Sequence, residues 1–158
     1  MELKCIINGQ AVAAEARADM TLLDFLRARG YKSVKCGCET TNCGLCTVWL
    51  DGKPVLSCAG PAMRVQGREV TTLEGLKEEA EEFGRFLGEQ GAEQCGFCSP
   101  GFIMNVLAME RELPGTPSSE EIREYLAGNL CRCTGYAGQM RAIRIWLACR
   151  RQKEGENA

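Results

Sequence analysis

Eight of the 11 cysteines in this 158-residue chain fall into two groups of four, and their spacing restricts what the chain can fold around. The first cysteine group reads C-x4-C-x2-C and then a more distant C, and it consists of Cys38, Cys43, Cys46 and Cys58. The second cysteine group reads C-x2-C, a long gap and C-x-C, and it consists of Cys95, Cys98, Cys131 and Cys133. Each group holds the four thiolates that one iron–sulfur cluster needs.

The first cysteine group has the spacing of a plant-type [2Fe–2S] site. Three of its members come from nine consecutive residues, so we expect a loop there. The Asp51-Gly52 turn would bring the chain back so that Cys58 lies on the other side of the cluster. Gly37 and Gly44 would let backbone N–H groups approach the sulfur atoms of the anionic cluster. A zinc site is the alternative, but zinc knuckles favour two C-x2-C pairs and this group has one.

The second cysteine group also indicates an iron–sulfur site. Its C-x2-C pair precedes a helix expected to begin near Pro100, and the positive end of a helix dipole favours an anionic cluster. Its C-x-C pair brings two sulfur atoms from one tight turn, which is unusual for zinc. Arg132 would offset the charge of the cluster, or it is an ordinary solvated arginine. Two one-electron centres in so short a chain indicate an electron relay that serves chemistry done elsewhere.

The chain has no histidine, and this absence excludes several classes of site. A Ser-His-Asp triad, an H-E-x-x-H metalloprotease, a Rieske centre and a His-ligated haem all need imidazole. Cysteine therefore carries the metal chemistry. The net charge of −2 gives no electrostatic case for binding nucleic acid.

Neither a signal peptide nor an apolar run of membrane-spanning length is evident, so we expect a cytoplasmic protein without a membrane span. In that reducing compartment, clustered cysteines bind metal more often than they form disulfides. We expect Cys36 to be a spare thiol beside the first cysteine group. Cys5 and Cys149 are expected to be small buried hydrophobic residues.

Hydrophobic patterning and turn signals predict an α+β fold. The first half reads as short antiparallel hairpins around one helix, a β-grasp layout, with strands over 3–7, 11–16, 47–50, 53–56 and 69–73. Asn8-Gly9 and Asp51-Gly52 are the expected hairpin turns, and Thr21 is the expected N-cap of the helix. The second half predicts helices over 77–90, 100–112, 118–126 and 137–151, followed by a polar, frayed tail over 152–158. We therefore expect a ferredoxin-like [2Fe–2S] domain at 1–76 and a four-helix [2Fe–2S]-binding domain at 77–158.

At these motifs the chain resembles the molybdenum hydroxylases, the family of xanthine dehydrogenase, aldehyde oxidoreductase and carbon monoxide dehydrogenase. The segments CGLCTV (43–48) and VTTLEGL (70–76) resemble the ferredoxin-like domain of that family. The segments QCGFCSPG (94–101) and GNLCRCTGY (128–136) resemble its helical cluster domain. The match covers nearly the whole chain in the same order, and the length suggests a separate small subunit.

The resemblance implies an electron-transfer subunit with two [2Fe–2S] clusters and no catalytic residue of its own. In the family, electrons pass from molybdopterin on a large subunit to the helical-domain cluster, then to the ferredoxin-like cluster, and usually to FAD on a third subunit. Gln94 is implied to contact the pterin, and Cys133 to bind iron and approach the pterin. These enzymes oxidise a C–H bond of a heterocycle or an aldehyde. A purine-type substrate is expected first and carbon monoxide second.

The chain departs from the family pattern in the first cysteine loop. Thr41 stands where the family usually has glycine, so a positive φ there would strain a β-branched residue, unless Asn42 takes that conformation instead. Ser99 stands where threonine is common, and the isoleucine usual after Tyr136 is absent.

Two functions of other classes fit the cysteines alone. One is a zinc-stabilised interaction module, and the other is a free-standing carrier that serves several enzymes. An obligate subunit should expose a large apolar face, whereas a free-standing carrier should not.

Overall fold

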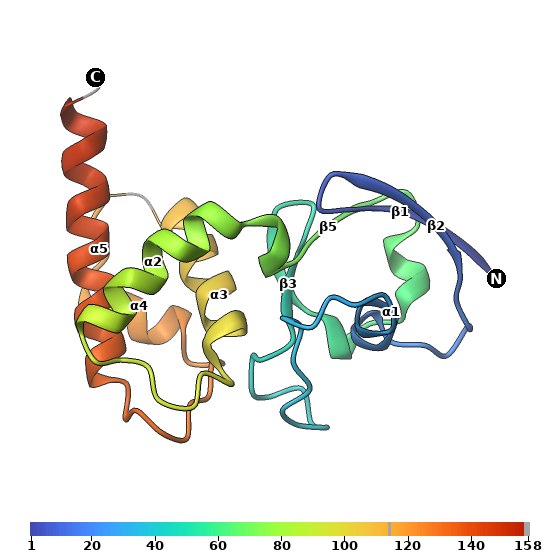
Figure 1. Cartoon of the computed structure of the whole chain (residues 1–158), viewed down its shortest axis with the longest axis horizontal. Coiled ribbons are helices and arrows are strands. Elements are labelled where there is room, and N and C mark those ends of the chain that lie inside the picture. The colour runs from blue at the N-terminus through green and yellow to red at the C-terminus, as the bar shows by residue number, and fades with distance from the viewer. Residues whose placement is uncertain (114, 157–158) are drawn as a thin grey trace.

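The computed structural model describes residues 1–113 and 115–156, without the side chains of Glu154 and Glu156. The strands gather in the first half of the chain and the longer helices in the second, and the two halves lie side by side (Figure 1). Strand β3 and helix α3 face each other at the border between the halves. Within the described residues, no helix is both long and apolar enough to cross a membrane.

Five strands form one mixed sheet in the order β2-β1-β5-β3-β4. Their bounds are β1 (Glu2–Ile7), β2 (Gln10–Glu15), β3 (Thr47–Leu50), β4 (Lys53–Leu56) and β5 (Glu69–Thr71). Two antiparallel hairpins, β1–β2 and β3–β4, are joined through β5, which runs parallel to β1 and antiparallel to β3. The sequence predicted the hairpins but not the parallel pairing, because that pairing joins distant parts of the chain.

The hairpins form where the turn signals predict them. Asn8 and Gly9 have φ angles of 52° and 76°, and Asp51 and Gly52 have 49° and 79°. Such pairs of left-handed residues match the twist of two paired strands. The last strand is shorter than predicted, because the N–H group of Thr72 donates to the side chain of Asn8 instead of extending the sheet.

Helix α1 (Leu22–Ala28) covers the sheet and fills the first core. Thr21 caps it by accepting a hydrogen bond of 3.1 Å from the N–H group of Asp24, as predicted. Phe25 and Leu26 have no solvent-exposed surface and pack with the buried faces of β1 and β3. This core supports the loop that carries the first cysteine group.

The second half contains α2 (Lys77–Glu89), α3 (Ser99–Glu112), α4 (Ser119–Tyr125) and α5 (Ala137–Glu156). Buried side chains from all four helices share one core, and the rings of Phe83 and Trp146 lie 5.0 Å apart within it. The predicted frayed tail is wrong as far as residue 156, because α5 continues to Glu156. Lys153, on that extra length, pairs with Glu82 of α2 at 3.0 Å. Residues 157 and 158 of the predicted tail lie outside the described residues.

Trp49 of β3 ties the two halves together. Its side chain is 2 % exposed and lies in the core of the helical half. Its Nε1–H group donates to the carbonyl oxygen of Met104 on α3 at 3.0 Å, and the guanidinium of Arg111 lies 4.3 Å from its ring centre. One face of the sheet is therefore fixed against α3, and this fixes the two cysteine groups relative to each other.

Candidate functional site

The first cysteine group is assembled by a long loop and by the turn after β4. Cys46, where the loop enters β3, and Cys58 have sulfur atoms 3.3 Å apart. Cys38 and Cys43 form a second pair of thiols in hydrogen-bond contact. Cys58 also lies within electrostatic range of the other three thiols. All four residues predicted from the C-x4-C-x2-C spacing are thus brought together as two pairs.

The second cysteine group is likewise assembled as two pairs. The sulfur atoms of Cys95 and Cys133 lie 3.5 Å apart, and Cys98 and Cys131 are in hydrogen-bond contact. One member of each pair comes from the segment before α3, and the other comes from the loop between α4 and α5. All four line one cavity of about 470 Å³, which Cys38 and Cys43 of the first cysteine group also line.

Paired thiols are the donor arrangement that a two-iron cluster requires. Each iron of a [2Fe–2S] cluster takes two of the four thiolates. A zinc ion instead collects three or four ligands around one point. The residues present therefore fit two [2Fe–2S] clusters, one in each cysteine group.

The loop of the first cysteine group is shaped by two left-handed residues. Thr41 has a φ of 58° and Gly44 a φ of 73°, whereas Asn42 does not adopt a positive φ. Of the two alternatives, the positive φ therefore falls on Thr41 and not on Asn42. A β-branched residue thus adopts a strained conformation at the position where the family usually has glycine. A Cβ atom on Gly37 would lie 2.5 Å from Cδ2 of Leu45 and 3.4 Å from the sulfur of Cys43.

Hydrogen bonds and burial shift the pKa values of the thiols in the first cysteine group in opposite directions. Hydrogen bonds from the backbone of Thr40 and Asn42 lower the pKa of Cys38 to about 6. Burial, followed by the contact with Cys46, raises the pKa of Cys58 to about 12. Backbone groups aimed at sulfur favour the thiolate form that a metal binds.

Burial and hydrogen bonds also have opposite effects on the thiol pKa values of the second cysteine group. Burial, followed by the contact with Cys131, raises the pKa of Cys98 to about 12. Burial also raises the pKa of Cys131, but hydrogen bonds from Thr134, Cys133 and Cys98 together outweigh burial, so that this pKa is lowered overall. The hydroxyl of Thr134 donates to the sulfur of Cys131 at 3.2 Å. No sequence pattern indicated a separate role for Thr134, although it lies within the motif.

Tyr136 is a second residue of this loop whose role the sequence did not reveal. It has a φ of 66°, and its hydroxyl accepts a hydrogen bond of 2.7 Å from the N–H group of Cys131. This bond fixes the backbone that presents Cys131. On the other side of the group, Ser99 opens α3, and Pro100 lies in its first turn as predicted.

The remaining residues singled out in the sequence are placed as follows. Gln94 is exposed beside Cys95, and Arg132 is exposed between the two cysteines of the C-x-C pair. Cys36 is exposed, and its thiol donates to the carbonyl oxygen of Cys38 at 3.8 Å. Cys5 is buried in the first core as expected, whereas Cys149 is only half-buried on α5.

The cavity between the cysteine groups has an apolar rim. Phe97, Leu130 and Tyr136 line the cavity and are 48 %, 51 % and 38 % exposed. Large apolar side chains that are exposed together mark an interaction surface more often than chance. This surface surrounds Cys95 and Cys133, the exposed pair of the second cysteine group.

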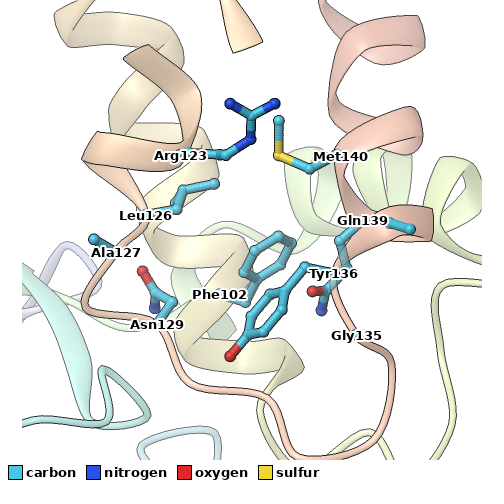
Figure 2. A pocket seen from close by; sticks show the side chains of 10 residues that line it. Phe102, Arg123, Leu126, Ala127, Asn129, Gly135, Tyr136, Gln139 and Met140 are labelled. Atoms are coloured by element: carbon cyan, nitrogen blue, oxygen red, sulfur yellow. The ribbon is translucent and has the colours of Figure 1, made fainter. Parts of the chain in front are cut away.

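A larger cavity of about 620 Å³ opens beside the same loop, between α4 and α5. Figure 2 shows Phe102 and Tyr136 pointing into it, with Arg123 and Met140 facing each other across it. Gln139 lines it and is itself 3 % exposed. Nothing in the sequence pattern predicted this cavity.

The two cysteine groups are in direct main-chain contact. The N–H group of Leu130, the residue before Cys131, donates a hydrogen bond of 2.9 Å to the carbonyl oxygen of Cys43. A short bonded path therefore connects a member of the first cysteine group with a member of the second. The described geometry can hold two metal clusters close together and allow an electron to pass between them.

Each half of the chain matches a known family of iron–sulfur domains. Residues 5–73 match the family described as 2Fe-2S iron-sulfur cluster binding domain, and residues 72–144 match the family described as [2Fe-2S] binding domain. A probable xanthine dehydrogenase subunit of Bacillus subtilis is 41 % identical over 97 % of this chain and 86 % of its own length. The xanthine dehydrogenase iron-sulfur-binding subunit of Escherichia coli O157:H7 is 44 % identical over 85 % of this chain and 86 % of its own length.

Among solved structures, a chain of quinoline 2-oxidoreductase from Pseudomonas putida 86 is similar to this one. It is 36 % identical, has a TM-score of 0.86, and the match covers 96 % of both chains. The chain therefore belongs to the molybdenum hydroxylase family, as one of its small iron–sulfur subunits, and is a component of an oxidoreductase.

Proposed function

We propose that this chain carries two [2Fe–2S] clusters and relays electrons from a molybdopterin centre on a large partner subunit toward FAD on another subunit. One cluster would be held in a ferredoxin-like domain at 1–76 and the other in a four-helix domain at 77–158. The clusters supply reversible one-electron chemistry. The proposed ligands are Cys38, Cys43, Cys46 and Cys58 for the first cluster and Cys95, Cys98, Cys131 and Cys133 for the second.

The observation that carries the proposal is the pairing of the thiols. Both measured sulfur–sulfur distances, 3.3 and 3.5 Å, join cysteines that are far apart in the chain or separated by a hairpin. Such pairs form only if the fold brings them together. Cys38 with Cys43 and Cys98 with Cys131 are the other two pairs. Because each iron takes two thiolates, two pairs in each cysteine group would suit one two-iron cluster there. The zinc-module alternative has no comparable support.

The chemistry of the surface supports the direction of the relay. Cys95 and Cys133 are exposed within the apolar rim of Phe97, Leu130 and Tyr136. A large subunit that docks on this rim would exclude water from the second cysteine group and bring its pterin toward Gln94 and Cys133. Electrons would then enter at the second cysteine group and leave from the first. A free-standing carrier would not need this rim.

The chain's own residues would hold the metal and tune its potential. Hydrogen bonds to ligand sulfur stabilise the reduced, more negative cluster. Thr134 supplies one such bond to Cys131, and the backbone of Thr40 and Asn42 supplies others to Cys38. The chain contributes no acid or base to the oxidation itself.

The substrate of the complex is proposed to be a purine of the xanthine type, since the two relatives described above are parts of xanthine dehydrogenases. An aldehyde oxidoreductase or carbon monoxide dehydrogenase complex is the alternative. The proposed complex is a hetero-oligomer in the reducing cytoplasm.

An anaerobic affinity purification of the chain from its native host tests the proposal. We expect a large molybdenum-bearing chain and a flavin-bearing chain to co-purify, with iron on this subunit. Recovery of the iron-bearing chain alone would contradict the subunit assignment and favour a free-standing carrier. Zinc in place of iron would contradict the redox function.

A further inference from the structure

A network of side-chain hydrogen bonds lies at the contact between the two cysteine groups; its members Asn129 and Thr47 are buried, and Asn105 between them is half-buried. Asn129, one residue before Leu130, is 5 % exposed. Its Nδ2 group donates to the carbonyl oxygen of Gly101 at 3.4 Å, and its Oδ1 atom accepts from Nδ2 of Asn105 at 2.7 Å. The loop of the second cysteine group is thus bonded to two successive turns of α3.

The network continues into the loop of the first cysteine group. Nδ2 of Asn105 also donates to Oγ1 of Thr47 at 3.4 Å. The Thr47 hydroxyl, which is buried, donates to the carbonyl oxygen of Gly44 at 2.7 Å. Asn129, Asn105 and Thr47 therefore form an unbroken bridge from the residue next to Leu130 to the residue next to Cys43.

The backbone segments joined by this bridge are in close contact at two glycines, Gly44 and Gly101. A Cβ atom on Gly44 would lie 2.6 Å from both the carbonyl oxygen of Gly128 and Nδ2 of Asn129. A Cβ atom on Gly101 would collide with the carbonyl oxygen of Gly44 and would lie 2.8 Å from the Cα of Leu45. Glycine at both positions lets three segments meet, and the network holds them there.

We propose that Asn129, Asn105 and Thr47 are positioning residues for electron transfer between the two clusters. They hold the N–H group of Leu130 on the carbonyl oxygen of Cys43, and so fix both the separation of the clusters and the bonded path between them. This inference rests on the proposed function. Cys95, Cys98, Cys131 and Cys133 would hold the cluster that gives up one electron, and Cys38, Cys43, Cys46 and Cys58 would hold the cluster that accepts it, with no bond made or broken.

The physical basis is the rigidity of a connected hydrogen-bond network whose two end members, Asn129 and Thr47, are buried. Buried polar groups that all find partners specify one arrangement, and removal of one member leaves the others unpaired. Electron transfer depends steeply on separation, so a small relaxation of the two loops lowers its rate. A network that merely joins the halves would affect stability and leave the interaction between the clusters unchanged.

The test uses the full chain, purified anaerobically with its iron. Asn129→Ala and Asn105→Ala interrupt the bridge at different points. Tyr125→Phe is the matched control, because it removes another side-chain hydrogen bond of the same helical half, from Tyr125 to Glu112, outside the network. Iron content, the low-temperature electron paramagnetic resonance of the fully reduced protein, and the rate of electron exchange between the clusters after photoreduction are measured for each.

We expect the wild type and Tyr125→Phe to show two signals that broaden each other. Both network variants should keep their iron and both signals, with weaker mutual broadening and several-fold slower exchange. Unchanged broadening and exchange rate in the network variants would overturn the positioning role. If Asn129→Ala does not retain iron, Asn105→Ala decides in the same way, because it leaves Asn129 in place. A wild type without two signals would instead refute the proposed function.

Discussion

The main-chain N–H group of Leu130 donates to the carbonyl oxygen of Cys43 at 2.9 Å, although the two residues belong to different halves of the chain. Cys43 belongs to the first cysteine group, and Leu130 directly precedes Cys131 of the second. The fold thus joins the loops of the two cysteine groups by a main-chain hydrogen bond, and residues of β3 and α3 support that bond.

Substitution of one member of the first cysteine group should distinguish the paramagnetic signals of the two clusters. Cys43→Ala removes one thiol of the Cys38–Cys43 pair, so we expect one paramagnetic signal of the reduced protein to disappear and the other to remain. Cys36→Ala is the control, because Cys36 lies outside the thiol pairs, and it should leave both signals. Survival of both signals in Cys43→Ala would show that the first assignment is wrong.

The hydroxyl of Thr134 should tune the second cluster alone. Thr134→Val removes the hydrogen bond to the sulfur of Cys131, which stabilises the reduced state. A net hydrogen-bond energy of ~0.5–1.5 kcal/mol corresponds to a potential lowered by about 20–65 mV for one electron. A redox titration followed by paramagnetic resonance measures this shift. Thr134→Ser should restore the potential, and an equal shift of both clusters would argue against a local effect.

The apolar rim should carry partner binding. Leu130→Glu places a charge on a side chain that is exposed in the isolated chain, so we expect iron content to stay unchanged and co-purification of the large subunit to be lost. Ile6→Glu is the matched control, because Ile6 is also exposed but lies on β1 in the other half. Equal recovery of the large subunit with both variants would place the interface elsewhere.

Trp49 should contribute more to stability than any single exposed residue. Trp49→Ala removes a fully packed ring and its hydrogen bond to Met104, with an expected loss of about 3–5 kcal/mol in the free energy of unfolding. Ile145→Ala, at an exposed position of α5, should change that free energy by less than about 0.5 kcal/mol. Denaturant unfolding followed by circular dichroism compares the two. Similar losses would contradict the role of Trp49 as the joint between the halves.

The ion pairs of Glu82 should make the stability of the protein depend on pH, and the direction follows from the lowered pKa of Glu82. Burial raises the pKa of this carboxyl, but Lys153 at 3.0 Å and Arg150 at 3.1 Å outweigh burial and lower it overall. A lowered pKa contributes stability above the unfolded value of about 4.3, and this contribution is lost as the pH falls through the folded pKa. Glu82→Gln should therefore be less stable than wild type by about 1 kcal/mol at neutral pH.

Thermal unfolding of both proteins at a series of pH values measures this difference. The gap in melting temperature should stay constant at higher pH and narrow below about pH 4.3. A gap that widens as the pH falls would contradict the assigned direction of the shift.

Local signals in the sequence were sufficient to predict the elements around both cysteine groups. The Asn8-Gly9 and Asp51-Gly52 turns, the Thr21 cap and Pro100 at the start of α3 all lie where the sequence indicated. These features depend on a few neighbouring residues, and each has one dominant physical cause. The spacing and the family resemblance indicated the four members of the second cysteine group, but not how their thiols pair.

Features that depend on distant contacts could not be predicted. The parallel pairing of β1 with β5 and the insertion of Trp49 among the helices join parts of the chain with no local signature. Asn105 and Asn129 read as ordinary polar residues until the fold brings them together. The left-handed Thr41 was one of two alternatives, because strain in a β-branched residue is tolerated only when surrounding structure imposes it.

The most direct test of the central claim is low-temperature electron paramagnetic resonance of the full chain, purified anaerobically and reduced with dithionite, together with its iron content. We predict about four iron atoms per chain and two distinct signals, one from each cysteine group. About two iron atoms with a single signal, or a colourless protein that holds zinc, would contradict it.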